Sequence, residues 1–219
     1  MASQKFGFVT VAPVSGSGDQ AVNFSGEKHT GRLQRTINLT VTTNGGAKKA
    51  LVVNQAAAAE VVRSDSPNAS VQKTGGNVTI TGKSNSTKLT FSVTPAEENG
   101  LTLQLPADYT AAGKTTANGA IIADDPGAAG EFVWSITISD VPANVTIEEL
   151  TATLKVTAAG GQTANVTVTQ AAGDSTIELD KETINLDVNG TQQTVNVTSN
   201  DSWTWAQAAA RTVLRMMGR

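Results

Sequence analysis

The sequence predicts an all-β protein made of small antiparallel β-sandwiches. First, 31 Thr, 22 Val and 9 Ile make 62 of the 219 residues β-branched, and such side chains favour a pleated, half-buried surface. Second, aromatic residues make up only 4% of the chain while Gly numbers 20, which is typical of thin aliphatic cores joined by many tight turns. Third, apolar and polar residues alternate strictly over many short segments, as in strands with one buried and one solvated face.

Seven segments carry this alternation, with Val, Ile or Leu on one side and Thr, Asn or Ser on the other. They are residues 36–42, 77–81, 88–94, 135–139, 151–157, 165–169 and 194–198. Residues that tolerate positive φ separate the predicted strands at 44–46, 75–77, 99–100, 118–119, 160–161 and 189–190. These turns predict that hairpins make most of the connections.

An internal sequence repeat divides the chain into modules. Residues 51–57 (Leu-Val-Val-Asn-Gln-Ala-Ala) and 166–172 (Val-Thr-Val-Thr-Gln-Ala-Ala) both follow a Gly-Gly turn and end in Gln-Ala-Ala, so each is typical of the last strand of a domain. We therefore expect an N-terminal domain over 1–60, a middle sandwich over 61–174 and a C-terminal piece over 175–219. Only the middle piece has a typical sandwich length.

Composition argues against an enzyme. Sixteen Lys and Arg against nineteen Asp and Glu leave a net charge of −3, so no overall positive field favours nucleic acid. With no Cys and one His, the chain lacks the residues for Cys-ligated zinc, iron–sulfur clusters, thiol nucleophiles and two-His metal sites. We predict no catalytic residue, no metal site and no cofactor. The one His, His29, is expected in a loop, and Asp124 and Asp125 in a solvated turn.

The chain as given carries no recognisable targeting segment. Its first ten residues hold one Lys and alternate at once between polar and apolar residues, unlike a signal peptide. No stretch approaches the ~18 apolar residues of a membrane helix, so we expect no membrane partner. Cys-free, Thr-rich sandwiches without an export signal are typical of virion proteins, which lysis releases, although removal of a leader gives the same pattern.

Two parts of the chain carry a family resemblance. Residues 175–190, followed by 194–203 with Ser-Asn shortly before a Trp, resemble the opening half of a BACON domain. Residues nearer the N-terminus resemble the second half of the same module: Ser15–Gly18, Gly31, Arg32, Arg35 and Val52–Gln55. BACON is an Ig-like module named as Bacteroidetes-associated and carbohydrate-binding. The resemblance implies tandem Ig-like sandwiches, as in Bacteroidetes proteins and in Ig-like decoration or head-fibre proteins of their tailed, crAss-like phages.

The order of the two halves departs from the family pattern. A chain that begins with the second half of a sandwich and ends with the first half leaves two incomplete sheets, whose unpaired edges are costly to bury and prone to pair elsewhere. We expect a neighbouring subunit, or a larger scaffold, to complete them. The alternative is that residues 1–60 form an ordinary small sandwich.

Two tryptophans are candidate partner-binding residues. Trp203 and Trp205 lie at positions i and i+2, so in a strand they share a face and can stack on a sugar ring or on a protein partner. The preferred interpretation of Trp203, from the Ser-Asn-x-x-Trp pattern, is a core side chain.

Beyond Trp205 the composition changes to a strong helix former. A short C-terminal helix over 206–219 is predicted to dock in a partner's groove through a basic stripe and an apolar side formed by Arg211, Arg215, Arg219, Met216 and Met217. So short a helix is marginal in water, and an added chain end or a shifted reading frame gives the same break in composition.

These observations predict a non-enzymatic structural protein of a virus particle. It would be an auxiliary or decoration protein on the capsid, or part of a head-fibre base, of a tailed phage of gut Bacteroidetes. Its expected partners are the major capsid protein or other virion subunits, with many copies or a homo-oligomer. The alternative is a carbohydrate-binding module that binds glycans in an extracellular or bacterial surface protein.

Overall fold

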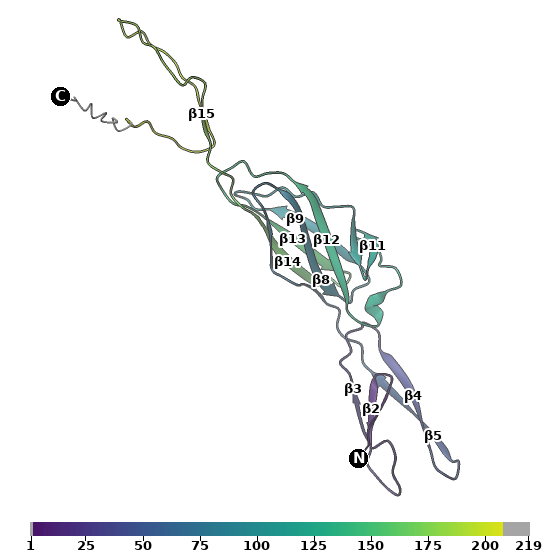
Figure 1. Cartoon of the computed structure of the whole chain (residues 1–219). Coiled ribbons are helices and arrows are strands. Elements are labelled where there is room, and N and C mark those ends of the chain that lie inside the picture. The colour runs from purple at the N-terminus through teal and green to yellow at the C-terminus, as the bar shows by residue number, and fades with distance from the viewer. Residues whose placement is uncertain (1, 208–219) are drawn as a thin grey trace, which may run out of the picture.

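The computed structural model describes residues 2–207, and within them the chain folds into sixteen β-strands and one 3₁₀ turn, η1 (Pro126–Ala128). These residues contain no α-helix, so the predicted all-β class is confirmed. The strands form three bodies that follow one another along an elongated molecule (Figure 1). We call them the N-terminal module (2–59), the middle domain (60–174) and the C-terminal segment (175–207). No helix in the described part is long and apolar enough to cross a membrane.

The middle domain consists of two sheets. The first contains, in spatial order, β11 (Lys114–Ala117), β10 (Asp108–Ala111), β12 (Phe132–Val141), β8 (Gly76–Ser84) and β6 (Val62–Ser64). The second contains β7 (Asn68–Val71), β14 (Thr163–Gln170), β13 (Leu150–Ala158) and β9 (Leu89–Pro95). All neighbours are antiparallel except β7 and β14, which are parallel.

One apolar core lies between these sheets. Trp134 of the first sheet and Leu154 of the second are both fully buried in it. Phe91 contacts Tyr109 and Trp134, with ring centroids 4.8 Å and 5.5 Å apart. Gly82 makes room for the indole, because a Cβ there would lie 2.3 Å from the Trp134 ring. Each large side chain buried in this way contributes about 1.5–3 kcal/mol to stability.

The N-terminal module has two small sheets that stay separate. One contains β1 (Gln4–Phe6), β2 (Val9–Ala12) and β3 (Asn23–Gly26), and the other is the hairpin of β4 (Arg35–Thr42) and β5 (Lys48–Gln55). The prediction of a strand over 36–42 is confirmed. Apolar side chains of both sheets remain accessible between them.

The C-terminal segment extends from the middle domain at the end opposite the N-terminal module (Figure 1). Only β15 (Ile177–Leu179) and β16 (Val197–Ser199) pair in it. The strand predicted over 194–198 is thus shorter and displaced toward the C-terminus. The predicted helix over 206–219 falls almost entirely outside the described residues, and Ala206 and Gln207 are not helical.

The prediction that turn signals mark hairpins is only partly right. Residues 44–46 and 160–161 do close the hairpins β4–β5 and β13–β14. The turn at 75–77, however, leads from β7 to β8, which belong to different sheets. Positive φ reverses the direction of the chain, but the packing of the core decides which sheet the next strand joins.

Candidate functional site

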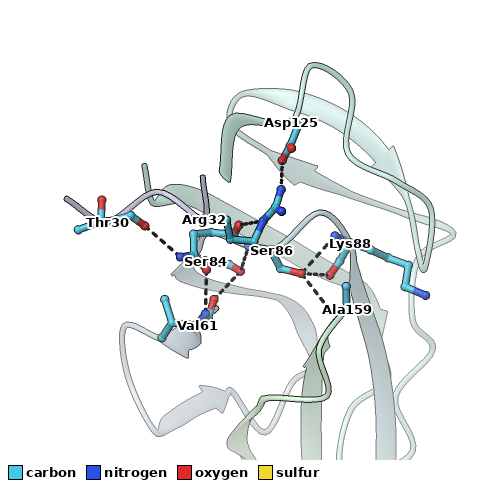
Figure 2. Close-up of polar contacts among 9 residues, drawn as sticks. Thr30, Arg32, Val61, Ser84, Ser86, Lys88, Asp125 and Ala159 are labelled. Carbon is cyan, nitrogen blue, oxygen red and sulfur yellow. Dashed lines mark hydrogen bonds and ion pairs between the residues drawn. The ribbon is translucent and has the colours of Figure 1, made fainter. Parts of the chain in front are cut away.

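A buried polar joint connects the N-terminal module to the middle domain. The fully buried Asn85 donates from Nδ2 to the carbonyls of Thr30 and Ala59, both at 2.9 Å. Its Oδ1 accepts the amide of Val61 at 2.8 Å, and Ser84 Oγ donates to the Val61 carbonyl at 2.7 Å (Figure 2). Because Thr30 belongs to the module and Val61 to the middle domain, the side chain of Asn85 bridges the two bodies.

Arg32 clamps the same joint from the side of the module (Figure 2). Its Nε donates to the carbonyl of Asn85 at 2.8 Å, and its guanidinium pairs with the carboxylate of Asp125 at 2.5 Å. Gly127 packs so closely against Asn85 that a Cβ there would lie 2.0 Å from the backbone carbonyl oxygen of Asn85. Three of the four hydrogen bonds that the side-chain amide of Asn85 can make go to backbone groups, which is typical of a structural contact.

The same contacts recur 115 residues further along, where the middle domain meets the C-terminal segment. Asn200 Nδ2 donates to the carbonyls of Val145 and Asp174, both at 2.9 Å, and its Oδ1 accepts the amide of Thr176 at 2.8 Å. Ser199 Oγ donates to the Thr176 carbonyl at 2.7 Å. Each of these five residues lies 115 positions after the one that makes the same contact at the first joint. We call such positions counterparts.

Strands are counterparts as well. The hairpin β4–β5 pairs eight residues with eight in the same register as β13–β14. Gln55 and Gln170, which end these hairpins, both donate from Nε2 at 2.7 Å to counterpart carbonyls, those of Glu27 and Pro142. The pair β15–β16 repeats the register of β6 with β8. The N-terminal module thus repeats contacts of the second part of the middle domain, and the C-terminal segment repeats those of the first part.

The hairpin of the N-terminal module lacks the neighbouring strands that cover its counterpart in the middle domain. The hairpin β13–β14 has β7 and β9 beside it and a second sheet above it, whereas in the described part β4–β5 has no further strand at either edge. Val41 is therefore 68% exposed while its counterpart Val156 is fully buried. Between the two small sheets runs an open groove of about 540 Å³, whose apolar walls include Phe6, Val11, Phe24, Leu39, Val41 and Leu51.

The C-terminal segment leaves a second apolar face bare. Leu186 is 62% exposed, although its counterpart Val71 is 4% exposed in the middle domain. Ile177 and Leu179 are also exposed, and together with Val197 and the two tryptophans they line a shallow groove of about 290 Å³. Exposed apolar surface of this extent is typical of an interaction site.

Both predicted tryptophans lie on this face. Trp203 is 45% exposed, so its interpretation as a core side chain is wrong for the single chain, since no second sheet in the described part covers β15 and β16. Trp205 is 69% exposed. The two rings meet edge to face, with centroids 6.0 Å apart and planes at 83°. They therefore do not form the flat double platform on which a sugar ring stacks.

The two open ends carry opposite charges. The N-terminal module has six basic and two acidic residues, a net charge of +4, from Lys5, Lys28, Arg32, Arg35, Lys48 and Lys49 against Asp19 and Glu27. The C-terminal segment, residues 175–207, has one basic and five acidic residues, a net charge of −4, from Lys181 against Glu178, Asp180, Glu182, Asp187 and Asp201, and the sequence after it adds Arg211, Arg215 and Arg219. Within the described residues the two ends are thus opposite in net charge.

Local hydrogen bonds keep two of these acids ionised. The Asn196 amide donates to Asp180 at 2.8 Å and lowers the pKa of that carboxyl group. The Thr191 hydroxyl donates to Asp187 at 2.7 Å and lowers the pKa of that one. Both carboxylates therefore keep their negative charge throughout the neutral pH range.

The remaining candidate residues add little to a functional site. Arg211, Arg215, Arg219, Met216 and Met217 lie outside the described residues. His29 lies in a loop, with its Nε2 2.7 Å from the Leu33 carbonyl, while Asp124 pairs with Lys114. The described part contains no cluster of three or more acidic or His side chains able to hold a metal ion.

The sequence patterns do not single out Asn85 or its serine neighbours, and they include Arg32 only in the resemblance to a BACON module. A signal for the joint was available, because the dipeptide Ser-Asn occurs at 84–85 and again at 199–200, with the same spacing as the two Gln-Ala-Ala strand ends. Comparing the chain with itself at this spacing would have found the joint.

A family model described as Toastrack DUF4097 matches residues 36–206. The match begins at β4, spans the whole middle domain and ends beyond β16. No curated protein and no solved structure matches the chain.

Proposed function

The chain belongs to the Toastrack DUF4097 family, and we propose that it is a non-enzymatic structural protein whose open ends are completed by strands of partner chains. The observation that carries this proposal is that strands with counterpart registers are covered in the middle domain and bare at both ends. Covering a bare apolar face recovers about 25 cal/mol per Å². Such faces favour assembly over catalysis.

The architecture proposed with this function is a series of Ig-like sandwiches. The middle domain would be one complete copy, and the N-terminal module and the C-terminal segment would be parts of two further copies. Its two sheets and the recurrence of one joint at both of its ends support this interpretation. Stacked copies with equivalent joints would make a stiff rod.

The assembly that we propose is a bacteriophage particle. The protein would be an auxiliary or decoration protein of the capsid, or part of a head-fibre base, in contact with the major capsid protein or other virion subunits. The resemblance to BACON modules and the Cys-free, Thr-rich composition support this setting. Many symmetry-related copies would add avidity to small individual interfaces.

Purified particles test the virion proposal. We expect gradient-purified phage from a host culture to contain this chain in a fixed ratio to the capsid protein, measured by quantitative mass spectrometry. The recombinant chain is also expected to sediment with particles that lack it. Recovery only from bacterial surface fractions would contradict the proposal.

The exposed Trp205 favours one alternative, a carbohydrate-binding module on a bacterial surface or secreted protein. On this alternative, the chain binds defined glycans on an array and Trp205→Ala abolishes that binding. Val188→Ala is the matched control, because Val188 is fully exposed on the same segment and outside the groove. Absence of glycan binding leaves the structural proposal in place.

A further inference from the structure

We infer that the C-terminal segment of a second copy of this chain adds a strand to the outer edge of β5, beside the groove of the N-terminal module, so that copies join head to tail. This inference rests on the proposed function and names the partner. The segment and the groove lie at opposite ends of the molecule, with the middle domain between them (Figure 1). One chain therefore cannot close its own groove with its own segment.

The middle domain supplies the pattern for the joined pair. There β7 lies parallel to β14, with Thr167 opposite Asn68 and Gln170 opposite Val71. The counterpart of β14 is β5, whose outer edge carries no strand in the described part. The counterpart of β7 is residues 183–186, which pair with no strand among residues 2–207. Each side of the missing pair thus exists in the molecule, at opposite ends.

Shifting the register by 115 positions gives the contacts of the joined pair. Thr183 would lie opposite Val52, and Leu186 opposite Gln55. In the middle domain the Ala171 amide donates to the Val71 carbonyl at 3.2 Å, and the counterpart bond runs from Ala56 to Leu186 of the second copy. The side chain of Leu186 would then be covered as that of Val71 is.

Charge favours the same occupant. The groove belongs to a module of net charge +4, and residues 175–207 carry −4. In the parallel register, Glu182 precedes the paired residues and lies toward the end of β5 that carries Lys48 and Lys49. Attraction between the two ends orients copies head to tail and opposes contacts between like ends.

Such an interface uses two different surfaces of each copy. A heterologous contact of this kind produces rings when its rotation closes and filaments when it does not. The expected species is therefore a series of oligomers that grows with protein concentration, in contrast to a single closed dimer.

Sedimentation of the full chain with matched variants tests this inference. We expect the native chain to form concentration-dependent oligomers in analytical ultracentrifugation, and raised salt to weaken them. Leu186→Lys is expected to raise the dissociation constant about 100-fold, because it places a charge where a buried Leu belongs. Val188→Lys is the control: Val188 is fully exposed and its counterpart is the exposed Lys73, so association should fall only by the effect of the added positive charge, which both variants share. Both positions are exposed in the single chain, so neither change disturbs its fold.

Cross-linking tests the register. The chain has no Cys, so introduced thiols are the only ones present. Asn54 and Asn185 are counterparts of the paired Thr169 and Ser70, and a mixture of the N54C and N185C chains should form a mixed disulfide dimer on mild oxidation. N189C replaces N185C in the control mixture and should not form it.

The outcomes separate this inference from the proposed function. A native chain that stays monomeric up to millimolar concentration, equal association of the two lysine variants, or no preference for the N54C and N185C pair would overturn the head-to-tail contact. A monomer that still co-sediments with phage particles would leave the structural function intact with a different partner. Failure of that co-sedimentation alone, with the disulfide formed, would instead remove the virion setting.

Discussion

The hairpins β13–β14 and β4–β5 both pair eight residues with eight in counterpart registers, yet the first is buried in a sandwich and the second lies open. Both hairpins therefore form the same pair of antiparallel strands. Whether such a pair is covered depends on β7, β9 and the opposing sheet, which belong to other parts of the chain. Alternation decides which side is to be buried, and long-range partners decide whether it is.

The two joints differ in a related way. Asn85 is fully buried and Arg32 closes over it, while Asn200 makes the same bonds at an exposed position. The counterpart of Arg32 is Ile147, so the second joint has no equivalent clamp. We therefore expect the N-terminal module to be held more firmly than the C-terminal segment.

Among these substitutions, replacing a tryptophan should give the largest difference in stability between the closed middle domain and the open C-terminal segment. Trp134→Ala is expected to lower the free energy of unfolding by about 3–5 kcal/mol, because it leaves a large cavity between the two sheets. Trp205→Ala removes an exposed ring and should change it by less than about 0.5 kcal/mol. Urea denaturation of dilute chain, followed by circular dichroism, measures both. Similar losses for the two variants would mean that Trp205 is covered in solution.

The joints provide the next comparison. Asn85→Ala leaves two buried carbonyls and one amide without their partner, and we expect a loss of about 3 kcal/mol together with faster proteolysis near residues 58–61. Asn200→Ala breaks the same bonds where water can replace them, so about 1 kcal/mol is expected. The measurements are urea denaturation and limited proteolysis. Equal losses would show that the second joint is as dry as the first.

Counterpart valines allow the same substitution in both hairpins. Val156→Ala should cost about 2 kcal/mol, from the lost apolar burial and the residual cavity. Val41→Ala should cost less than about 0.5 kcal/mol in dilute chain, because its side chain is already in water. At high concentration the cost of Val41→Ala should rise if a partner covers the groove. A thermal melt at two concentrations measures this change.

The sequence predicts the strands well where alternation is strict, as for β4, β8, β13 and β14. It also places the repeated strand ends at Gln55 and Gln170, because identical residues recur after Gly-Gly turns. It does not predict the contacts of Asn85, since strand alternation does not mark an Asn between two Ser residues, its partners lie up to 55 residues away, and only the recurrence of Ser-Asn at 199–200 signals the position. The position of Trp203 was missed because burial depends on a second sheet, which local pattern does not report.

The smallest effect concerns pH and the single tyrosine of the chain. Burial between the sheets raises the pKa of the Tyr109 phenol, so the folded chain keeps this proton to higher pH than the unfolded chain, which releases it near ~10. The stability that this difference contributes is present below ~10 and is lost as pH rises through the folded pKa, at no more than about 1.4 kcal/mol per unit. Absorbance at the phenolate band follows Tyr109 alone, since the chain has one Tyr. We expect ionisation at higher pH in the native chain than in urea. The same phenol pKa in the native chain and in urea, with the circular dichroism of the native chain unchanged, would show that water reaches Tyr109. The core of the middle domain would then be less closed than that of a packed sandwich.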